Sequence, residues 1–226
     1  MPPINANLEG LCQLKYAELF DNVLQDCEDV TLSFYGDVVG GSTPSKSMSS
    51  YYTDKGIAWL TPKDLSENKS KFISRGNIDI TDSGFSNSST KLMPKGTILY
   101  TSRAPIGYIA IAKNEITTNQ GFKSIVPNKD CYRSFIYYYL KNNFDLINGL
   151  ASGSTFMEIS GSSMKTVPIP KIPLDAAIDF ESFCKDIFDY QEQLESEIEQ
   201  LTKVRNYLLP KLMSGEIDVS QLDLVD

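Results

Sequence analysis

The residues of this chain that could do chemistry are few, and they do not make up a familiar catalytic set. The 226-residue sequence has no histidine, which excludes histidine-based triads, most zinc enzymes and imidazole acid–base catalysis. The four cysteines show no Cys-x-x-Cys spacing, which favours reduced thiols over a zinc site or a disulfide framework; they are Cys12, Cys27, Cys131 and Cys184. The sequence therefore predicts no catalytic residue and no metal ligand.

Two short runs can still be interpreted as active-site motifs. Glu67-Asn-Lys69, with Asp54 or Asp64 upstream, loosely matches the acid, acid-x-lysine pattern of metal-dependent nucleases. Such triplets arise readily by chance, and a solvated loop is the more ordinary interpretation. The run from Gly41 to Ser47 is similar to a phosphate-binding loop, but a serine stands where Walker A needs a glycine before its lysine. The sequence also lacks Gly-x-Gly-x-x-Gly, so a nucleotide or S-adenosylmethionine fold is not expected.

Polar side chains suited to nucleic-acid contacts are more frequent. Asn and Gln pair with adenine edges, Arg and Lys with guanine edges, and Ser, Thr and Gly hold phosphates. For Asn119 and Gln120 the alternative is an ordinary turn, in which Asn119 makes an Asx turn and Gly121 supplies a positive φ. The candidate DNA-binding residues are Ser45, Lys46, Lys63, Lys91, Arg103, Asn119, Gln120, Lys123, Ser154, Thr155 and Lys165.

Charge is distributed unevenly along the chain. The total of −8 divides into −5 for residues 1–29, +6 for residues 30–173 and −9 for residues 174–226. A polyanion would be attracted to the basic middle and repelled by the acidic ends. This asymmetry places the candidate nucleic-acid surface in residues 30–173.

The elements that must position these residues are mostly short strands. The N-terminal segment predicts a helix over Leu8–Leu24 with Asn7 as its N-cap. The alternating prolines of residues 167–173 predict an extended segment. Between them, short apolar runs separated by glycines predict strands at 30–35, 57–60, 78–80, 97–101, 108–112 and 123–127, with helices at 133–143 and 145–150.

The stretch 174–213 predicts a long helix. An apolar column recurs every seven residues, with solvent-exposed acids such as Glu195 and Glu199 beside it. A helix of roughly 35 residues is on the order of 50 Å long, which exceeds a small domain, so the stripe predicts pairing with a second copy rather than burial on its own core. Pro210 is expected to break or kink the helix. The dimerisation column is Phe180, Ile187, Leu194, Leu201 and Leu208.

The predicted fold class is α+β. A mixed, strand-rich globular domain (30–173) follows an N-terminal helical segment (1–29) and precedes the coiled-coil-like helix (174–213), with Gly215 as its stop in an acidic tail (214–226). No run approaches the roughly 18 apolar residues of a membrane span. The N-terminus has no basic and apolar signal regions, which favours a cytoplasmic location.

Several of these runs, taken in order, carry a resemblance to a known family. The chain resembles the DNA-specificity subunit of Type I restriction–modification enzymes over nearly its whole length. It departs in size, with one recognition domain and one long helix where the family has two of each, so it looks like a half-subunit. The runs are Gly41–Ser45, Ile57–Asp64, Gly96–Leu99, Thr101–Gly107, Thr118–Phe122, Ser152–Phe156, Pro168–Pro170 and Leu208–Ile217.

The resemblance implies a DNA reader and scaffold without chemistry of its own. The recognition domain would bind one half of a split duplex site, and a homodimer through the long helix would supply the second half. Methyltransferase subunits and the motor-nuclease subunit would join it and carry S-adenosylmethionine, ATP and Mg²⁺. Two alternatives stay open: a dimeric coiled-coil adaptor that binds protein, and a nuclease that uses Glu67 and Lys69.

Overall fold

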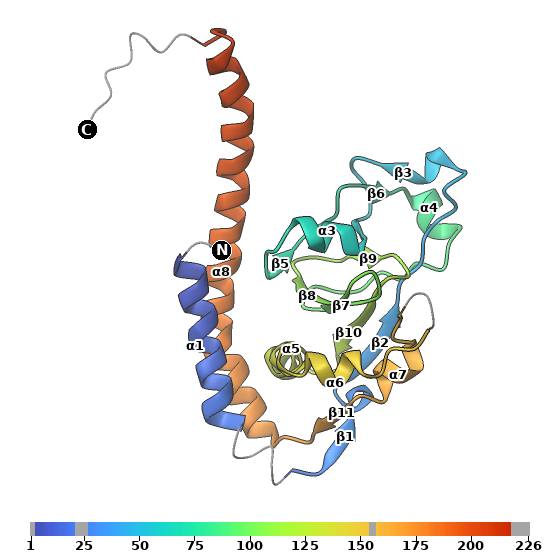
Figure 1. The fold of residues 1–226 in the computed structure, drawn as a ribbon, viewed down its shortest axis with the longest axis vertical. Helices are drawn as coiled ribbons and strands as arrows, with labels where there is room; N and C mark the ends of the chain where they lie inside the picture. The colour runs from blue at the N-terminus through green and yellow to red at the C-terminus, as the bar shows by residue number, and fades with distance from the viewer. Residues whose placement is uncertain (1–2, 21–26, 154–156, 218–226) are drawn as a thin grey trace, which may run out of the picture.

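The computed structural model describes residues 3–20, 27–153 and 157–217, so the predictions for Ser154 and Thr155 lie outside the described residues. The chain forms a long helical stalk with a globular domain beside it (Figure 1). The stalk consists of α1 (Pro3–Phe20) and α8 (Leu174–Met213). The described residues between these two helices, 27–153 and 157–173, form the globular domain. None of the described helices is long and apolar enough to cross a membrane.

The globular domain is built on a five-stranded sheet in the order β2-β10-β7-β8-β5. Its neighbouring strands are antiparallel except for the parallel pair of β5 and β8. Successive side chains of a strand point to opposite faces, and both faces of β7 are buried. The strands are β2 (Gly36–Gly40), β5 (Phe72–Ile73), β7 (Ile98–Ser102), β8 (Ile106–Ala112) and β10 (Lys123–Pro127).

Each face of this sheet contributes to a different apolar core. Ile98 and Tyr100 of β7 face the core shared with the helices α1, α5 (Arg133–Asn142) and α8. Leu99, between them, faces a second core that contains Leu60 and Phe122. The sheet is therefore the wall between the stalk side of the domain and the loops on its other side.

Shorter elements complete the domain. A capping box of Thr61 and Asp64 starts α3, with Pro62 in the first turn. The small strands pair as β3 with β6 and β4 with β9. The remaining elements are η1 (Leu32–Phe34), η2 (Ser49–Tyr51), η3 (Asp130–Tyr132), α3 (Pro62–Glu67), α4 (Asp82–Ser86), α6 (Phe144–Asn148), α7 (Gly161–Lys165), β3 (Tyr52–Thr53), β4 (Trp59–Leu60), β6 (Asp79–Ile80) and β9 (Thr117–Thr118).

The two ends of the globular domain leave the stalk side by side. Strand β1 (Asp29–Thr31) pairs antiparallel with β11 (Pro168–Pro170). The hydroxyl of Tyr35 ties this junction together, since it donates to the carbonyl of Pro170 at 2.8 Å and accepts from the backbone N–H of Ile172 at 2.8 Å. Entry to and exit from the domain are thus held at one point (Figure 1).

The α+β class and the long C-terminal helix are confirmed, but several predicted boundaries are wrong. Helix α1 already begins at Pro3, so Asn7 lies within it rather than at its cap, and the predicted end beyond Phe20 lies outside the described residues. The predicted strand at 30–35 is cut short because a 3₁₀ helix begins at Leu32. Pro210 does not end α8, which continues to Met213.

Helix α1 runs antiparallel to α8 and covers only the first half of it (Figure 1). Tyr16 and Phe20 of α1 meet Phe180 of α8 with ring centroids 5.8 and 5.4 Å apart. Side chains of α5 close the same core, where Phe20 and Phe135 lie 5.1 Å apart. Such edge-on aromatic contacts add to the burial of their large apolar surfaces. Helix α1 and the first half of α8 therefore share one apolar core with the globular domain.

This packing corrects the predicted dimerisation column. Phe180 is fully buried in the chain's own core, and Ile187 packs against that core. Leu194 is half-buried. Leu201 and Leu208 are 60% and 36% exposed. The sequence predicted that the whole column forms one dimer interface. Its first residues, Phe180 and Ile187, instead pack inside the same chain, because α1 and α5 cover them.

A buried polar cluster joins the globular domain to the stalk. The side chain of Lys71, which is 2% exposed, forms an ion pair with Glu9 of α1. It also donates to Gln191 Oε1 of α8 at 2.8 Å and to the hydroxyl of Tyr138 at 3.2 Å. Although burial acts against it, the ammonium groups of Lys71 and Lys141 keep the pKa of Glu9 below its usual value. We call Lys71, Glu9, Tyr138, Gln191 and Glu195 the Lys71 cluster.

Glu195 completes the Lys71 cluster, so its prediction as a solvent-exposed residue is wrong. Its two carboxylate oxygens accept the backbone N–H groups of Lys71 and Phe72, each at 3.0 Å, and the residue is 8% exposed. Burial raises the pKa of Glu195. The carboxylate satisfies two N–H groups at the start of β5, which would otherwise be buried without a partner.

Glu195→Ala should lower the free energy of unfolding by about 3 kcal/mol, because two buried backbone donors lose their acceptor and each costs roughly 1–3 kcal/mol. Glu199→Ala, one turn further along α8, is the matched control. Its exposed ion pair with Lys203 should contribute less than about 0.5 kcal/mol. Urea unfolding followed by circular dichroism measures both, and equal effects would contradict this account of Glu195.

Candidate nucleic-acid interface

Loops that lie far apart in the sequence meet at one end of the small parallel pair β4–β9. The backbone N–H of Ser42 donates to the carbonyl of Thr118 at 2.9 Å, and the indole N–H of Trp59 donates to the carbonyl of Ser42 at 3.0 Å. The N–H of Asn119 donates to the carbonyl of Leu60 at 2.8 Å. A Cβ on Gly41 would lie 2.1 Å from the carbonyl oxygen of Asn119. Only a glycine therefore allows these loops to approach so closely.

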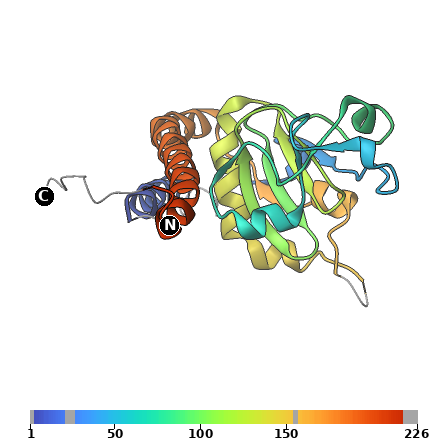
Figure 2. The same ribbon diagram turned by 90° about the horizontal axis from the view of Figure 1, so that it is seen from above.

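The end of β7 joins the same group of loops. Ser102 donates its backbone N–H to the carbonyl of Gly121 at 2.8 Å, and its own carbonyl accepts from the N–H of Ile159 at 3.0 Å. Ser152 and Glu158 form a β-bridge with two hydrogen bonds of 3.0 Å. These bonds bring Glu158 next to the tip of the β7–β8 hairpin. In Figure 2 this part of the domain lies on the side away from the stalk.

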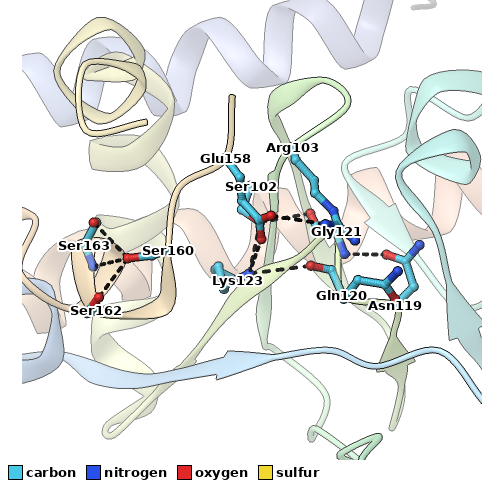
Figure 3. A network of polar contacts seen from close by, with 10 residues as sticks. All are labelled: Ser102, Arg103, Asn119, Gln120, Gly121, Lys123, Glu158, Ser160, Ser162 and Ser163. Atoms are coloured by element: carbon cyan, nitrogen blue, oxygen red, sulfur yellow. Dashed lines mark hydrogen bonds and ion pairs between the residues drawn. The ribbon is translucent and has the colours of Figure 1, made fainter. Parts of the chain in front are cut away.

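Two of the predicted cations converge on Glu158 (Figure 3). Arg103 Nη1 and Lys123 Nζ lie 3.1 Å from different oxygens of its carboxylate. Lys123 also donates to Ser102 Oγ at 3.3 Å and to the carbonyl of Gln120 at 3.5 Å. Partial burial raises the pKa of Glu158, but the nearby ammonium and guanidinium groups outweigh it and leave that pKa below its usual value. We call Arg103, Lys123 and Glu158 the Glu158 triad.

Asn119 and Gln120 differ in role. Asn119 Oδ1 accepts the N–H of Gly121 at 2.8 Å (Figure 3), which is the Asx turn of the alternative interpretation. The φ of Gly121 is not in the left-handed region; this glycine is required instead because a Cβ would lie 2.6 Å from Pro62 Cγ. Gln120 is exposed, and its Oε1 accepts from Thr43 Oγ1. Of the two amides, only Gln120 presents its side chain outward.

The remaining described candidates have exposed side chains. Ser45 contacts Ser47 through their hydroxyls at 2.8 Å. Lys63 forms an exposed ion pair with Glu67, one turn along α3. Lys46, Lys91 and Lys165 are exposed and have no ion-pair partner within the described residues. These last three lysines are the candidates whose charge is not already neutralised by a neighbouring carboxylate.

The residues of the nuclease alternative are held by other contacts. Asp64 Oδ2 accepts from the N–H and the hydroxyl of Thr61, both at 2.7 Å, while its Oδ1 accepts from the N–H of Asn77 at 2.9 Å. The ammonium of Lys69 lies 3.8 Å from the ring centroid of Tyr108. Within residues 3–20, 27–153 and 157–217, no group of three His, Cys, Asp or Glu side chains could hold a metal ion. Asp64 therefore acts as a helix cap.

Sequence reasoning missed Glu158, the residue that organises Arg103 and Lys123. A signal was present, because Glu158 is the only acidic residue between Asp145 and Asp175. Its two partners stand 55 and 35 positions earlier in the chain. No local pattern connects residues at such separations.

A domain that presents polar loops on its outer side and is carried on a helical stalk has the form of a macromolecule-binding module. The family model for the Type I restriction modification DNA specificity domain matches residues 25–208, and the chain belongs to that family. The resemblance seen in the sequence is thereby confirmed.

Individual relatives agree with this assignment. The chain is 38% identical over 201 residues to the Type I restriction enzyme MjaIX specificity subunit of Methanocaldococcus jannaschii, covering 72% of this chain and 46% of the relative. It is 28% identical to the HindI specificity subunit of Haemophilus influenzae, covering 82% and 40%. The chain thus spans less than half the length of these curated relatives.

A solved structure supports the fold. The HsdS subunit of Thermoanaerobacter tengcongensis superposes with a TM-score of 0.58 at 19% identity, over 94% of this chain and 52% of that one. At this identity the likeness concerns the fold alone. It shows that the stalk and the globular domain together correspond to about half of the larger subunit.

Gly121→Ala should lower the free energy of unfolding by about 1–3 kcal/mol, because the new methyl group would overlap Pro62. Gly10→Ala is the matched control: within α1, a Cβ at Gly10 would meet no atom within 4 Å. There the same substitution should stabilise the protein by roughly 0.5–1 kcal/mol through helix propensity. Thermal unfolding measures both variants. A neutral effect at Gly121 would show that the loops around it are not closely packed.

Proposed function

We propose that this chain is a DNA-reading subunit that binds one half of a bipartite duplex site through the loops around the Glu158 triad. One observation carries the proposal: the runs Gly41–Ser45, Ile57–Asp64, Thr101–Gly107 and Thr118–Phe122 are joined by hydrogen bonds into one loop group on the outer side of the domain. A group of loops on a rigid sheet is a common way to present contacts to a ligand.

The division of charge supports this surface. The globular segment of residues 30–173 carries a net charge of +6, and the C-terminal segment of residues 174–226 carries a net charge of −9. Lys46, Lys91 and Lys165 are free to meet phosphates, which supply the sequence-independent part of the affinity. Gln120 is the candidate for reading a base edge, since its amide can pair bidentately with adenine. The chain itself would carry out no catalytic step.

The second half of the site would come from a second copy of the chain. Helix α1 lies against only the first half of α8 (Figure 1). Beyond that half, a stripe of apolar side chains on α8 is exposed. Such a stripe on a helix needs a partner along its length. It consists of Ile198 (38% exposed), Leu201 (60%), Val204 (53%), Leu208 (36%) and Leu212 (40%).

An antiparallel pair of these stripes would place the two globular domains at opposite ends of a common rod. The globular domain contacts α8 between Phe180 and Glu195, so its centre lies about 17 residues from the middle of an overlap of residues 197–213. At about 1.5 Å per helical residue, the two domain centres would be about 50 Å apart, which corresponds to roughly 15 base pairs. Because a two-fold axis makes both halves identical, the target should be an interrupted palindrome.

The remaining partners follow from the family. Methyltransferase subunits would bind this scaffold and supply S-adenosylmethionine, and a motor-nuclease subunit would supply ATP and Mg²⁺ chemistry. A role on chromosomal DNA implies work in the cytoplasm. The relatives' shared description as specificity subunits of Type I restriction enzymes supports this assembly.

Lys165→Gln should weaken binding to duplex DNA. The slope of log affinity against log salt concentration should become less steep by about one, which is the value for one phosphate contact. Lys165 is suited to the test because α7, in which it lies, begins beside Lys123. Fluorescence anisotropy with a labelled duplex over a KCl series gives both quantities.

Lys185→Gln on α8 is the control for charge, because it removes one exposed lysine from the acidic stalk. Its salt dependence should equal that of the unmodified protein. If the stalk variant weakens binding as much as Lys165→Gln, the loops of the globular domain are not the DNA surface.

Leu201→Glu combined with Leu208→Glu should convert a dimer to a monomer, because paired glutamates cannot be buried in an apolar helix contact. The globular domain should stay folded, since neither leucine belongs to its core. Leu14→Glu, at a position of α1 that is 69% exposed, is the matched control and should stay dimeric. Analytical ultracentrifugation measures whether each variant is a monomer or a dimer. A monomeric unmodified protein at micromolar concentration would overturn the dimer.

A further inference from the structure

The Glu158 triad places two cations on one acid at the centre of the proposed DNA surface. The side chains of Arg103 and Glu158 are each 34% exposed, and that of Lys123 is 12% exposed. Each cation contacts a different carboxylate oxygen at 3.1 Å (Figure 3). Two converging cations on a small bidentate anion form the arrangement with which proteins also hold a phosphate.

The backbone that carries this carboxylate is held in place. It is held on both sides, by two hydrogen bonds of 3.0 Å with Ser152 and by the bond from the N–H of Ile159 to the carbonyl of Ser102. Lys123 is held further by Ser102 and Gln120. Arg103 differs, because among the described residues its ion pair with Glu158 is the polar contact that holds its side chain. Arg103 is therefore the member that loss of the Glu158 charge would free most fully.

We propose that Glu158 is an internal competitor of the DNA backbone that occupies the place of a phosphate between Arg103 and Lys123. This inference rests on the proposed function. An incoming phosphate must displace the carboxylate or accept repulsion from it. Sequence-independent binding depends almost entirely on phosphate contacts, so Glu158 weakens binding to every duplex by a common factor. A duplex that adds base contacts still binds, whereas one that offers phosphates alone is released.

The test is Glu158→Gln, which keeps the size of the side chain and removes its charge. Binding of the full chain to a labelled duplex of mixed sequence is measured by anisotropy over a KCl series. The affinity at low salt should rise roughly three- to tenfold, since the ion pairs to be overcome are partly exposed. The log–log salt dependence should steepen by about one to two, because one or two cations become free to neutralise phosphates.

Glu115→Gln is the matched control. It removes the same charge from an exposed position that follows the other end of β8, near Lys113, whose ammonium contacts Ser196 of the stalk. It should change neither quantity beyond the small effect of net charge. If Glu158→Gln behaves like the control, or binds the mixed-sequence duplex more weakly, the competitor role is wrong. Weaker binding would instead assign the carboxylate a direct contact with DNA.

The single variant Arg103→Gln gives a second test that does not depend on the folding of Glu158→Gln. With Glu158 present, Arg103 is already paired, so Arg103→Gln should leave the salt dependence unchanged. In the Glu158→Gln background the same substitution should lower the salt dependence by about one, the share of one freed cation. A loss of about one in the salt dependence of the single variant overturns the proposal. If no variant and no unmodified protein binds any duplex at low salt, the proposed function itself fails.

Discussion

A buried positive charge determines how this molecule is assembled. The Lys71 ammonium is almost fully removed from water, and a buried charge is tolerated only with good partners around it. Those partners come from three directions: Glu9 on α1, Tyr138 on α5 and Gln191 on α8. The Lys71 ammonium reaches all three partners only when the globular domain lies in one position against the stalk. The orientation of the loops relative to α8 therefore depends on this contact.

The sheet transmits that orientation to the far side of the domain. Strand β5 is held at the stalk by Glu195 and pairs with β8. Strand β8 pairs with β7, and β7 ends at Ser102 beside Gly121. Because both faces of this sheet are packed into apolar cores, it is a stiff connection. These paired strands thus fix the position of the Glu158 triad relative to the stalk.

The sequence predicted elements better than contacts. The helix 174–213 and strand β10 were evident because apolar periodicity is a local property. The face of α8 that is buried was not evident. That face ends in the polar residues Gln191 and Glu195, whose hydrogen-bond partners lie over 100 residues away in the sequence. Helix α3 was also missed, although Thr61 and Asp64 carry the capping signal.

The same limit applies to the site. The chemistry of their side chains selected Arg103, Asn119, Gln120 and Lys123, and the fold brings them together. It did not reveal that Asn119 is used by its own turn, or that Glu158 already engages two of the cations. Such competition between neighbours depends on tertiary contacts, which periodicity and composition do not record.

The paired strands β1 and β11 have a consequence for how such proteins diversify. With Asp29 opposite Pro170, the two ends of the globular domain lie side by side, so a different domain joined at these two strands would leave the course of either helix unchanged. A transplanted domain would also have to bring a lysine equivalent to Lys71 and an unpaired strand edge for Glu195. Donor domains that lack these two features should be accepted only together with matching changes in α1 and α8.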